Sequence, residues 1–158
     1  MEWGLSLGIL GAAVAVFLAG CGSSIGVGLA GQASCGVMSE DPEKFGSLLL
    51  LVALPGTQGI YGFLSAFLVI LKLGLLGGKV PLVTLQQGLA IFFACLPIAV
   101  LGFLSGIHQG KVCAAGVMMV AKQPKDFMKS IIMAALVETY AVLGLLITIL
   151  LLNGIKVG

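Results

Sequence analysis

The sequence predicts an all-α membrane protein with four transmembrane helices, arranged as two helical hairpins that repeat in parallel. Three observations predict this class. Hydrophobic residues make up 59% of the chain and charged residues only 9%, whereas soluble domains carry about 25% charged residues. Four apolar segments each exceed the roughly 20 residues that cross a bilayer. The two halves of the chain also match each other at an offset of about 82 residues.

The expected spans follow from where charged residues are absent. No charge occurs from Trp3 to Ser39 or from Phe45 to Leu71, and His108 is the only ionisable side chain between Val80 and Gly110 apart from cysteine. We expect a first hairpin over residues 1–78, with spans at about 3–38 and 46–73, and a second hairpin over residues 79–158, with spans at about 85–121 and 130–153.

The first and third spans are longer than a bilayer requires. The first would run about 54 Å as a helix, against about 30 Å of hydrocarbon, so we expect both to tilt or to protrude toward a docked partner. The links between the spans are too short to hold a soluble domain. The net charge of +2 is small and the chain has no Arg, so nucleic acid is not expected as a partner.

The repeat is carried by turns, glycines and span positions together. Pro42 falls on Pro124 and Phe45 falls on Phe127. Each half holds an even number of spans, so both halves cross the membrane in the same direction. Many secondary transporters use inverted repeats instead, which makes a small proton-coupled transporter the less favoured alternative. A parallel repeat suits rotational symmetry about the membrane normal.

Two rows of small residues, each four apart, mark the first and third spans. Such rows line one helix face and let backbones approach closely in lipid. They fit either packing within one chain or the inner wall of a ring of identical chains, and their presence in both repeats favours the ring. The rows are Gly20, Ser24 and Gly28 in the first span, and Gly102, Gly106 and Gly110 in the third.

Glu138 lies near the middle of the fourth span, where a carboxylate is costly and by default marks an ion or proton pathway. The repeat places Gly56 at the matching position, so each chain has one acid site. The third span supplies Gln109 as a further polar residue, next to His108. We interpret His108 as a helix-end or interfacial residue rather than a ligand.

The second span carries a set of residues spaced for one helical face, beside a proline. Pro55 lacks an N–H, and with Gly56 it allows a kink that could turn nearby carbonyls toward an ion. The residues that share the face are Leu54, Thr57, Gln58 and Tyr61.

The ion is predicted from the donor set, which contains oxygens and no thiolates and therefore suits hard cations. A proton carrier needs only a shielded carboxyl, whereas a dehydrated metal ion needs amide and hydroxyl oxygens to replace its water. One carboxylate balances one charge, and Ca²⁺ usually recruits more. Na⁺ is therefore favoured, with Li⁺ fitting similarly, and H⁺ stays open as the alternative.

The lysines predict an orientation in the membrane. The loops Glu40–Lys44 and Lys122–Lys129 carry more lysines than the other face, which has Lys72, Lys79 and Lys156. This excess weakly places the short loops in the cytoplasm and both termini on the outer side. Leu18–Cys21 looks like a lipoprotein cleavage box, but an acidic start and an apolar run that continues past it argue against cleavage.

Three motifs and one turn resemble a known family. They are Leu54-Pro55-Gly56-Thr57-Gln58-Gly59, Gly106-Ile107-His108-Gln109-Gly110-Lys111, Val137-Glu138-Thr139-Tyr140-Ala141 and the turn Pro42-Glu43-Lys44-Phe45. Over nearly its whole length the chain resembles the duplicated proteolipid, or c-ring protein, of V-type and archaeal-type rotary ATPases. It is most similar to subunit K of bacterial Na⁺-transporting V-type ATPases.

The resemblance implies a role for each polar residue. Glu138 would be the ion-binding carboxylate, and Tyr61 would donate a hydrogen bond to it and lock the occupied site. Na⁺ would be coordinated by Glu138, by the side-chain oxygens of Thr57, Gln58 and Gln109, and by the backbone carbonyl of Leu54. His108 departs from the family pattern, in which small residues are more usual.

The resemblance also implies an assembly in the cell membrane. Copies of the chain would form a rotor ring in the lipid bilayer, beside a stator subunit with a positive side chain and a central-stalk subunit docked on the short-loop face. The chain has no phosphate-binding Gly-rich loop, so we expect a component of an ATPase with no catalytic residue and no organic cofactor of its own.

Overall fold

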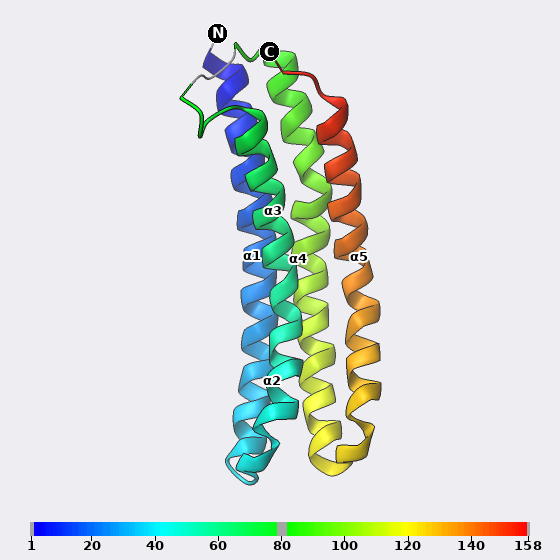
Figure 1. Ribbon diagram of the computed structural model, residues 1–158. Coiled ribbons are helices and arrows are strands. Elements are labelled where there is room, and N and C mark those ends of the chain that lie inside the picture. The colour runs from blue at the N-terminus through cyan, green and yellow to red at the C-terminus, as the bar shows by residue number, and fades with distance from the viewer. Residues whose placement is uncertain (1, 79–81, 158) are drawn as a thin grey trace.

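The computed structural model describes residues 2–78 and 82–157. The expected hairpin boundary falls at the edge of the gap between these ranges, and Lys79 lies outside the described residues. The described part is a bundle of long helices side by side, with both termini at one end and the short connections at the other (Figure 1). Within these two ranges, four segments are long and apolar enough to cross a membrane, so the predicted all-α membrane class is confirmed.

The first hairpin contains α1 (Glu2–Met38) and a second rod formed by η1 (Pro42–Lys44), α2 (Phe45–Ala53), η2 (Leu54–Gly56) and α3 (Thr57–Lys72). The second hairpin contains α4 (Leu85–Lys122), η3 (Pro124–Asp126) and α5 (Phe127–Gly154). In both hairpins a proline opens the short turn, where its missing N–H would have no helical partner in any case.

The start of α4 is fixed by a capping box. The hydroxyl of Thr84 accepts from the backbone N–H of Gln87, and the Gln87 side chain accepts from the backbone N–H of Thr84. This reciprocal pair satisfies two of the donors that a helix start leaves free. From there α4 runs for 38 residues, and α1 for 37, which confirms that these two helices exceed the length of a bilayer crossing.

The same tertiary hydrogen bond occurs in both hairpins. Ser23 Oγ donates to the carbonyl of Pro55 at 2.6 Å, and Ser105 Oγ donates to the carbonyl of Val137 at 3.1 Å. Each bond joins the first helix of a hairpin to its second rod at membrane depth. Because the residues correspond in the repeat, the duplication extends from sequence to side-chain geometry.

The proline in the second rod produces a short 3₁₀ turn without breaking the rod. Pro55 is buried in η2, and the backbone at the flanking Ala53 and Thr57 stays in the right-handed helical region. The carbonyl of Pro55 is held by Ser23 of α1. The predicted kink is therefore a local tightening from α- to 3₁₀-helix, with the helix axis continuing through it (Figure 1).

Helices α1 and α4 pack with their backbones in contact. A Cβ added to Gly106 would lie 2.6 Å from the backbone of Gly22, and one added to Gly110 would collide with the backbone of Gly26. Both approaches are shorter than real Cβ contacts, so these positions admit only glycine unless the helices separate. The close approach positions α4, and with it Gln109, against the rest of the bundle.

The two rows of small residues differ in their surroundings. Gly102, Gly106 and Gly110 pack against α1 of the same chain, and their part in a ring stays a prediction. A Cβ on Gly20 or Gly28 would meet nothing within 4 Å, and Ser24 is exposed. The first row stays a prediction for a contact with another chain.

The short-loop end is tied together by Lys44. Its ammonium donates to the carbonyl of Ala121 near the end of α4 at 3.1 Å and pairs with Asp41 at 2.9 Å. The hydrogen bond from Lys44 is the main cause that holds the pKa of Asp41 below its usual value. One lysine of the first loop thus stabilises the last turn of the second hairpin's long helix.

Candidate ion-binding site

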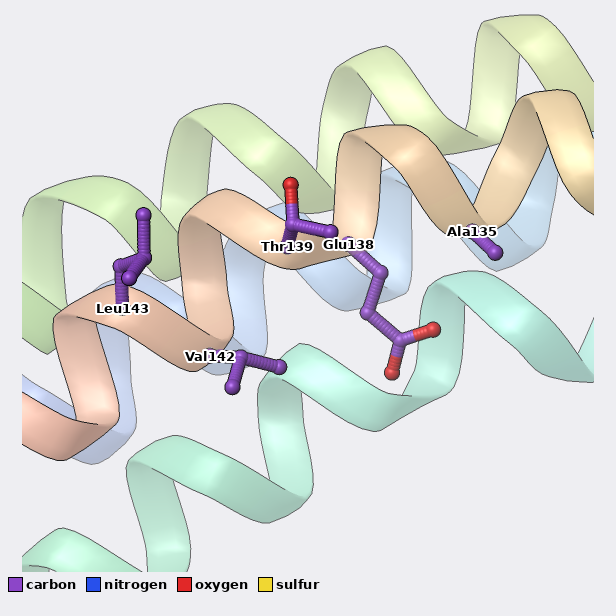
Figure 2. A pocket seen from close by; sticks show the side chains of 5 residues that line it. All are labelled: Ala135, Glu138, Thr139, Val142 and Leu143. Carbon is purple, nitrogen blue, oxygen red and sulfur yellow. The ribbon is translucent and has the colours of Figure 1, made fainter.

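Glu138 projects from α5 toward α3 and stays partly buried between the two helices. Figure 2 shows its carboxylate reaching toward the α3 ribbon, while Thr139 points to the other side of α5. Ala135 and Val142 lie one turn before and after it and line the same groove, together with Thr139 and Leu143.

Tyr61 of α3 holds one carboxylate oxygen. Its phenolic O–H donates to Glu138 Oε1 at 2.7 Å. This bond joins two residues that lie 77 positions apart in the sequence, one from each hairpin. The bond orients the carboxyl group of Glu138 toward α3.

The two glutamines meet in the interior. Gln58 and Gln109 are both fully buried, and the side-chain N–H of Gln58 donates to Gln109 Oε1 at 2.5 Å and to Ser105 Oγ at 3.1 Å. The side-chain N–H of Gln109 in turn donates to the carbonyl of Ala134 at 3.1 Å and to Glu138 Oε2 at 3.5 Å. A connected amide network therefore runs from α3 through α4 to the carboxylate.

One atom of this network has no donor. Gln58 Oε1 is buried, and no hydrogen-bond donor in the described part of the chain reaches it. Leaving a buried acceptor unpaired costs about 1–3 kcal/mol, and such atoms are rare in folded proteins. A buried amide oxygen without a donor, in a residue whose hydrogen bonds lead through Gln109 to a carboxylate, has the chemistry to receive a cation.

Leu54 and Thr57 take part in the turn that begins α3. Thr57 Oγ1 donates to the carbonyl of Leu54 at 3.0 Å, and the backbone N–H of Thr57 bonds the same carbonyl. This arrangement puts both residues one to two turns before Tyr61, but the bonds they make run within the turn rather than to Glu138. Their assignment as ligands stays a prediction, as does that of the other residues in the set.

Two groups of the site were missed by the sequence reasoning. Ser105 bonds the amide of Gln58, and the carbonyl of Ala134 accepts from Gln109. Ser105 lies one turn before Gln109 on α4, and Ala134 lies one turn before Glu138 on α5, so helical spacing alone could have indicated them. Together they orient both amides and leave the Gln58 oxygen free.

Among the residues that the structure describes, Glu138 forms no ion pair. The ion pairs in the described ranges lie at the short loops, where Lys44 meets Asp41 and Lys129 meets Asp126. The described residues also contain no group of three or more His, Cys, Asp or Glu side chains that could hold a metal ion. The site therefore combines one carboxylate with neutral oxygen and amide groups, which suits a monovalent cation or a proton.

The sequence profile of the ATP synthase C-subunit family matches the chain twice, at residues 10–69 and at residues 92–151. The chain belongs to this family. The starts and the ends of the two matched segments are offset by the same distance, about 82 residues, so the duplication expected from the sequence is confirmed. The resemblance to duplicated proteolipids is confirmed with it.

This member of the family has well-matched relatives along its length. It is 47% identical over 148 residues to the V-type sodium ATPase subunit K of Enterococcus hirae, covering 94% of this chain and 91% of the relative. It is 43% identical over 154 residues to the A-type ATP synthase subunit K of Methanocaldococcus jannaschii, covering 98% of this chain but only 65% of that relative.

The name of a more distant relative refers to protons rather than to sodium. The 16 kDa proteolipid of the V-type proton ATPase of Nephrops norvegicus is 29% identical over 144 residues, which cover 91% of this chain and 88% of the relative. Membership of the family thus agrees with a multi-pass membrane protein, and the choice of ion depends on the site.

Proposed function

We propose that this chain is the rotor-ring subunit of a V-type ATPase and that each copy carries one Na⁺ across the membrane at Glu138. The observation that carries the proposal is the buried, donorless oxygen of Gln58, set in one hydrogen-bond network with Gln109 and Glu138. The relative of 47% identity is a sodium ATPase subunit by its name, which supports the choice of ion.

The proposed ligand set draws on three membrane segments. Gln58 and Thr57 supply oxygens from the η2–α3 turn, Gln109 supplies one from α4, and Glu138 supplies the carboxylate from α5. The backbone carbonyl of Leu54 completes the set. Each neutral oxygen replaces one water of the hydrated ion, and the carboxylate cancels its charge, so an occupied site is neutral overall.

Occupation then requires a small rearrangement of hydrogen bonds. The Gln58 N–H already points toward Gln109 and Ser105. Its oxygen accepts no hydrogen bond from the described residues, so no donor has to leave before the ion binds. The Thr57 hydroxyl keeps its lone pairs for the ion, and its donation to Leu54 would be given up so that this carbonyl, which also accepts from the Thr57 backbone N–H, can coordinate the ion. Tyr61 stays bonded to Glu138 Oε1 and keeps the carboxylate turned inward.

Neutralisation couples the ion to rotation. An ionised carboxylate at the bilayer centre costs about 2.5–3.5 kcal/mol or more, so an empty, charged site resists facing lipid. Occupied copies can turn through the lipid, whereas an empty copy is stable only beside a positive side chain, which we assign to a stator subunit. Moving one charge against about 100 mV requires about 2.3 kcal/mol, which ATP hydrolysis elsewhere in the complex would supply.

The surroundings of the ring follow from the same proposal. The short-loop end, with Lys44, Lys122 and Lys125, would lie in the cytoplasm and bind the central stalk, and the termini would lie on the outer side. The length of α1 and α4 beyond the bilayer supports a docked partner at one end. The chain itself would be a component of the ATPase and would not hydrolyse ATP alone.

The test is protection of Glu138 from a carbodiimide, which modifies protonated carboxyl groups in apolar sites. Purified rings would be labelled near neutral pH with and without Na⁺, and the labelled residue identified by mass spectrometry. We expect Na⁺ to suppress labelling of Glu138, with K⁺ at equal concentration as the ionic-strength control. Equal labelling in all three conditions would contradict a sodium site.

A proton-carrying rotor is the second candidate, favoured by relatives that are proton ATPase subunits by name. In that case a protonated Glu138 would donate to a neighbouring oxygen and the Gln58 oxygen would stay unused. Labelling that depends on pH and is indifferent to Na⁺ would support this candidate and would leave the rotor role intact.

A further inference from the structure

The groove that contains the Glu138 carboxylate has a second polar side chain in its wall. The residues that line this groove, which we call the Glu138 groove, are Ala135, Glu138, Thr139, Val142 and Leu143. Of these described residues, Glu138 and Thr139 are polar and the other three are apolar. Figure 2 shows the Glu138 carboxylate directed toward α3 and Thr139 directed to the other side of α5. Thr139 thus borders the carboxylate that would carry the ion without belonging to the proposed ligand set.

Thr139 belongs to a turn that the chain contains twice. At the repeat offset of about 82 residues, Leu54 corresponds to Leu136 and Thr57 corresponds to Thr139. Thr57 Oγ1 donates to the carbonyl of Leu54 at 3.0 Å, and Thr139 Oγ1 donates to the carbonyl of Leu136 at 2.7 Å. Both hairpins therefore present the same pair of oxygens, a threonine hydroxyl and a leucine carbonyl. In the first hairpin these two oxygens are proposed ligands of Na⁺.

The Thr139 hydroxyl has lone pairs available for a cation. Its hydrogen is used in the bond to Leu136, and no residue that the structure describes donates a hydrogen bond to its oxygen. A hydroxyl oxygen has two lone pairs, so both are free. Threonines that bond their own helix are common and by themselves indicate no ligand. Thr139 differs from such a residue because it is exposed in the groove of an ion-carrying carboxylate and repeats a ligand pair.

The bonds that hold the Glu138 carboxylate toward the interior are few and unequal. Tyr61 donates to Oε1 at 2.7 Å, whereas Gln109 donates to Oε2 at 3.5 Å, which is at the limit for a hydrogen bond. Glu138 is also only partly buried. Successive residues point about 100° apart around a helix, so a rotation of this size brings the carboxylate across the Glu138 groove to the side of Thr139.

We propose that the Thr139 hydroxyl and the Leu136 carbonyl are transit ligands, which hold Na⁺ beside Glu138 while it moves between the inner site and the stator. This inference rests on the proposed sodium rotor. An ion that leaves the inner amide and hydroxyl oxygens gives up ligands before it has regained its water. The two oxygens of the Leu136–Thr139 turn replace part of that shell during the transfer. They change the rate of ion entry and exit, and they leave the affinity of the inner site unchanged.

Exchange of radioactive Na⁺ in purified full-length rings tests this role. Loaded rings would be chased with unlabelled Na⁺, and release would be followed by rapid filtration. T139V removes the hydroxyl and keeps the branched shape, so we expect release and uptake each to slow about five- to ten-fold, the effect of losing one neutral polar partner. The Na⁺ concentration that half-protects Glu138 from carbodiimide should stay the same, because both rates fall together.

The conservative substitution separates the hydroxyl from packing. T139S keeps the hydroxyl and should restore the exchange rate of the unchanged ring. Slow exchange in both T139V and T139S would attribute the effect to packing and would overturn the transit role. Native mass measurement shows whether each variant forms the ring, and T139A, which removes the same hydroxyl with a smaller side chain, replaces T139V if that ring does not assemble.

The repeat provides a matched comparison at the inner site. T57V makes the same change in the equivalent turn and should raise the Na⁺ concentration that half-protects Glu138, because Thr57 is a resident ligand in the proposed site. A T139V ring that exchanges Na⁺ at the normal rate would overturn the transit role. Loss of affinity in T139V equal to that in T57V would overturn it as well.

These outcomes are distinguishable from failure of the proposed function. If Na⁺ does not protect Glu138 in rings of the unchanged chain, the sodium site is wrong and the transit role is overturned with it. If Na⁺ protects Glu138 and T139V exchanges the ion normally, the sodium site stands and the transit role alone is overturned.

Discussion

The two hairpins are built on one plan and differ in what they do at the same depth. In both, a serine of the long helix bonds a carbonyl of the second rod, as Ser23 does with Pro55 and Ser105 with Val137. One residue after that carbonyl stands Gly56 in the first hairpin and Glu138 in the second. The backbone of the site is therefore generic, and the side chains placed on it create the ion chemistry.

The same comparison shows how the polar network is supported. In the complete site, Ser105 both donates to the rod and accepts from Gln58, so it links the scaffold to the ligands. The position of Gln58 in the other hairpin is Tyr140, which cannot coordinate through an amide oxygen. One half of a duplicated scaffold can therefore lose the ability to bind the ion and still keep its packing. The serine–carbonyl bonds hold the helices together, whereas other side-chain atoms coordinate the ion.

The largest effect, on Na⁺ transport, is expected from removing the charge of Glu138, the residue that distinguishes the second hairpin from the first. E138Q keeps the size of the side chain but removes the charge that balances Na⁺, so we expect ATP-driven Na⁺ transport to fall to background in reconstituted vesicles. The control is E40Q, which removes an acid of the short loop and should leave transport unchanged. Substantial transport by the E138Q enzyme would contradict the assignment of Glu138.

Adding the missing acid should make the hairpins alike in charge but not in binding. G56E places a carboxylate where no amide oxygens surround it, at a cost of about 3 kcal/mol for a charge at membrane depth. We expect less intact ring on native gels and no second Na⁺ per copy in a binding assay. G56A is the control for bulk, and two ions bound per G56E copy would show that the first hairpin holds a latent site.

Removing the Tyr61 hydroxyl should weaken the hydrogen bonding that holds the Glu138 carboxylate in place. Y61F deletes the bond to Glu138 Oε1, and hydrogen bonds to charged groups contribute about 1.5–3 kcal/mol, so we expect Na⁺ to bind about 10- to 100-fold more weakly. The measurement is the Na⁺ concentration that half-protects Glu138 from carbodiimide.

The other tyrosine provides the matched control for this change. Y140F removes a hydroxyl from an exposed residue on the other side of α5 and keeps its ring. Half-protection should occur at the same Na⁺ concentration as in the unchanged chain. Equal weakening by both substitutions would indicate that the hydroxyls act through general packing rather than through the carboxylate.

The smallest effect on Na⁺ affinity should come from substituting the equivalent serines, Ser105 and Ser23. This pair compares the two hairpins most directly. S105A removes the acceptor that orients Gln58, worth about 1 kcal/mol, and should weaken Na⁺ binding about five-fold. S23A removes the equivalent bond to the rod but touches no ligand, so its Na⁺ affinity should be unchanged. Equal effects of the two substitutions would mean that the serines support only the scaffold.

The sequence predicted the fold closely because membrane depth restricts what a chain can do. Long apolar segments must satisfy their backbone groups internally, so helices were required, and the span lengths followed from composition. Local turns were predictable for a similar reason, since Pro42 and Pro124 fix the backbone where each short connection ends. Pro55 was less predictable, because its surroundings in the bundle hold the rod together through a 3₁₀ turn.

The small-residue rows show where sequence spacing stops being informative. Gly102, Gly106 and Gly110 have the spacing of an interface, and the structure shows that α1 of the same chain fills it. Spacing specifies a helix face but not its partner, which depends on how each helix is rotated in the bundle.

By itself the sequence determined the class of the protein, the repeat and the kinds of atoms available to an ion, because residue types and helical periodicity are fixed along the chain. Only the tertiary structure decided that Tyr61 meets Glu138, 77 residues away, and that Gln58 keeps a free oxygen beside Gln109. Those contacts join different helices, so they depend on the rotation and axial register that close packing imposes on the whole bundle.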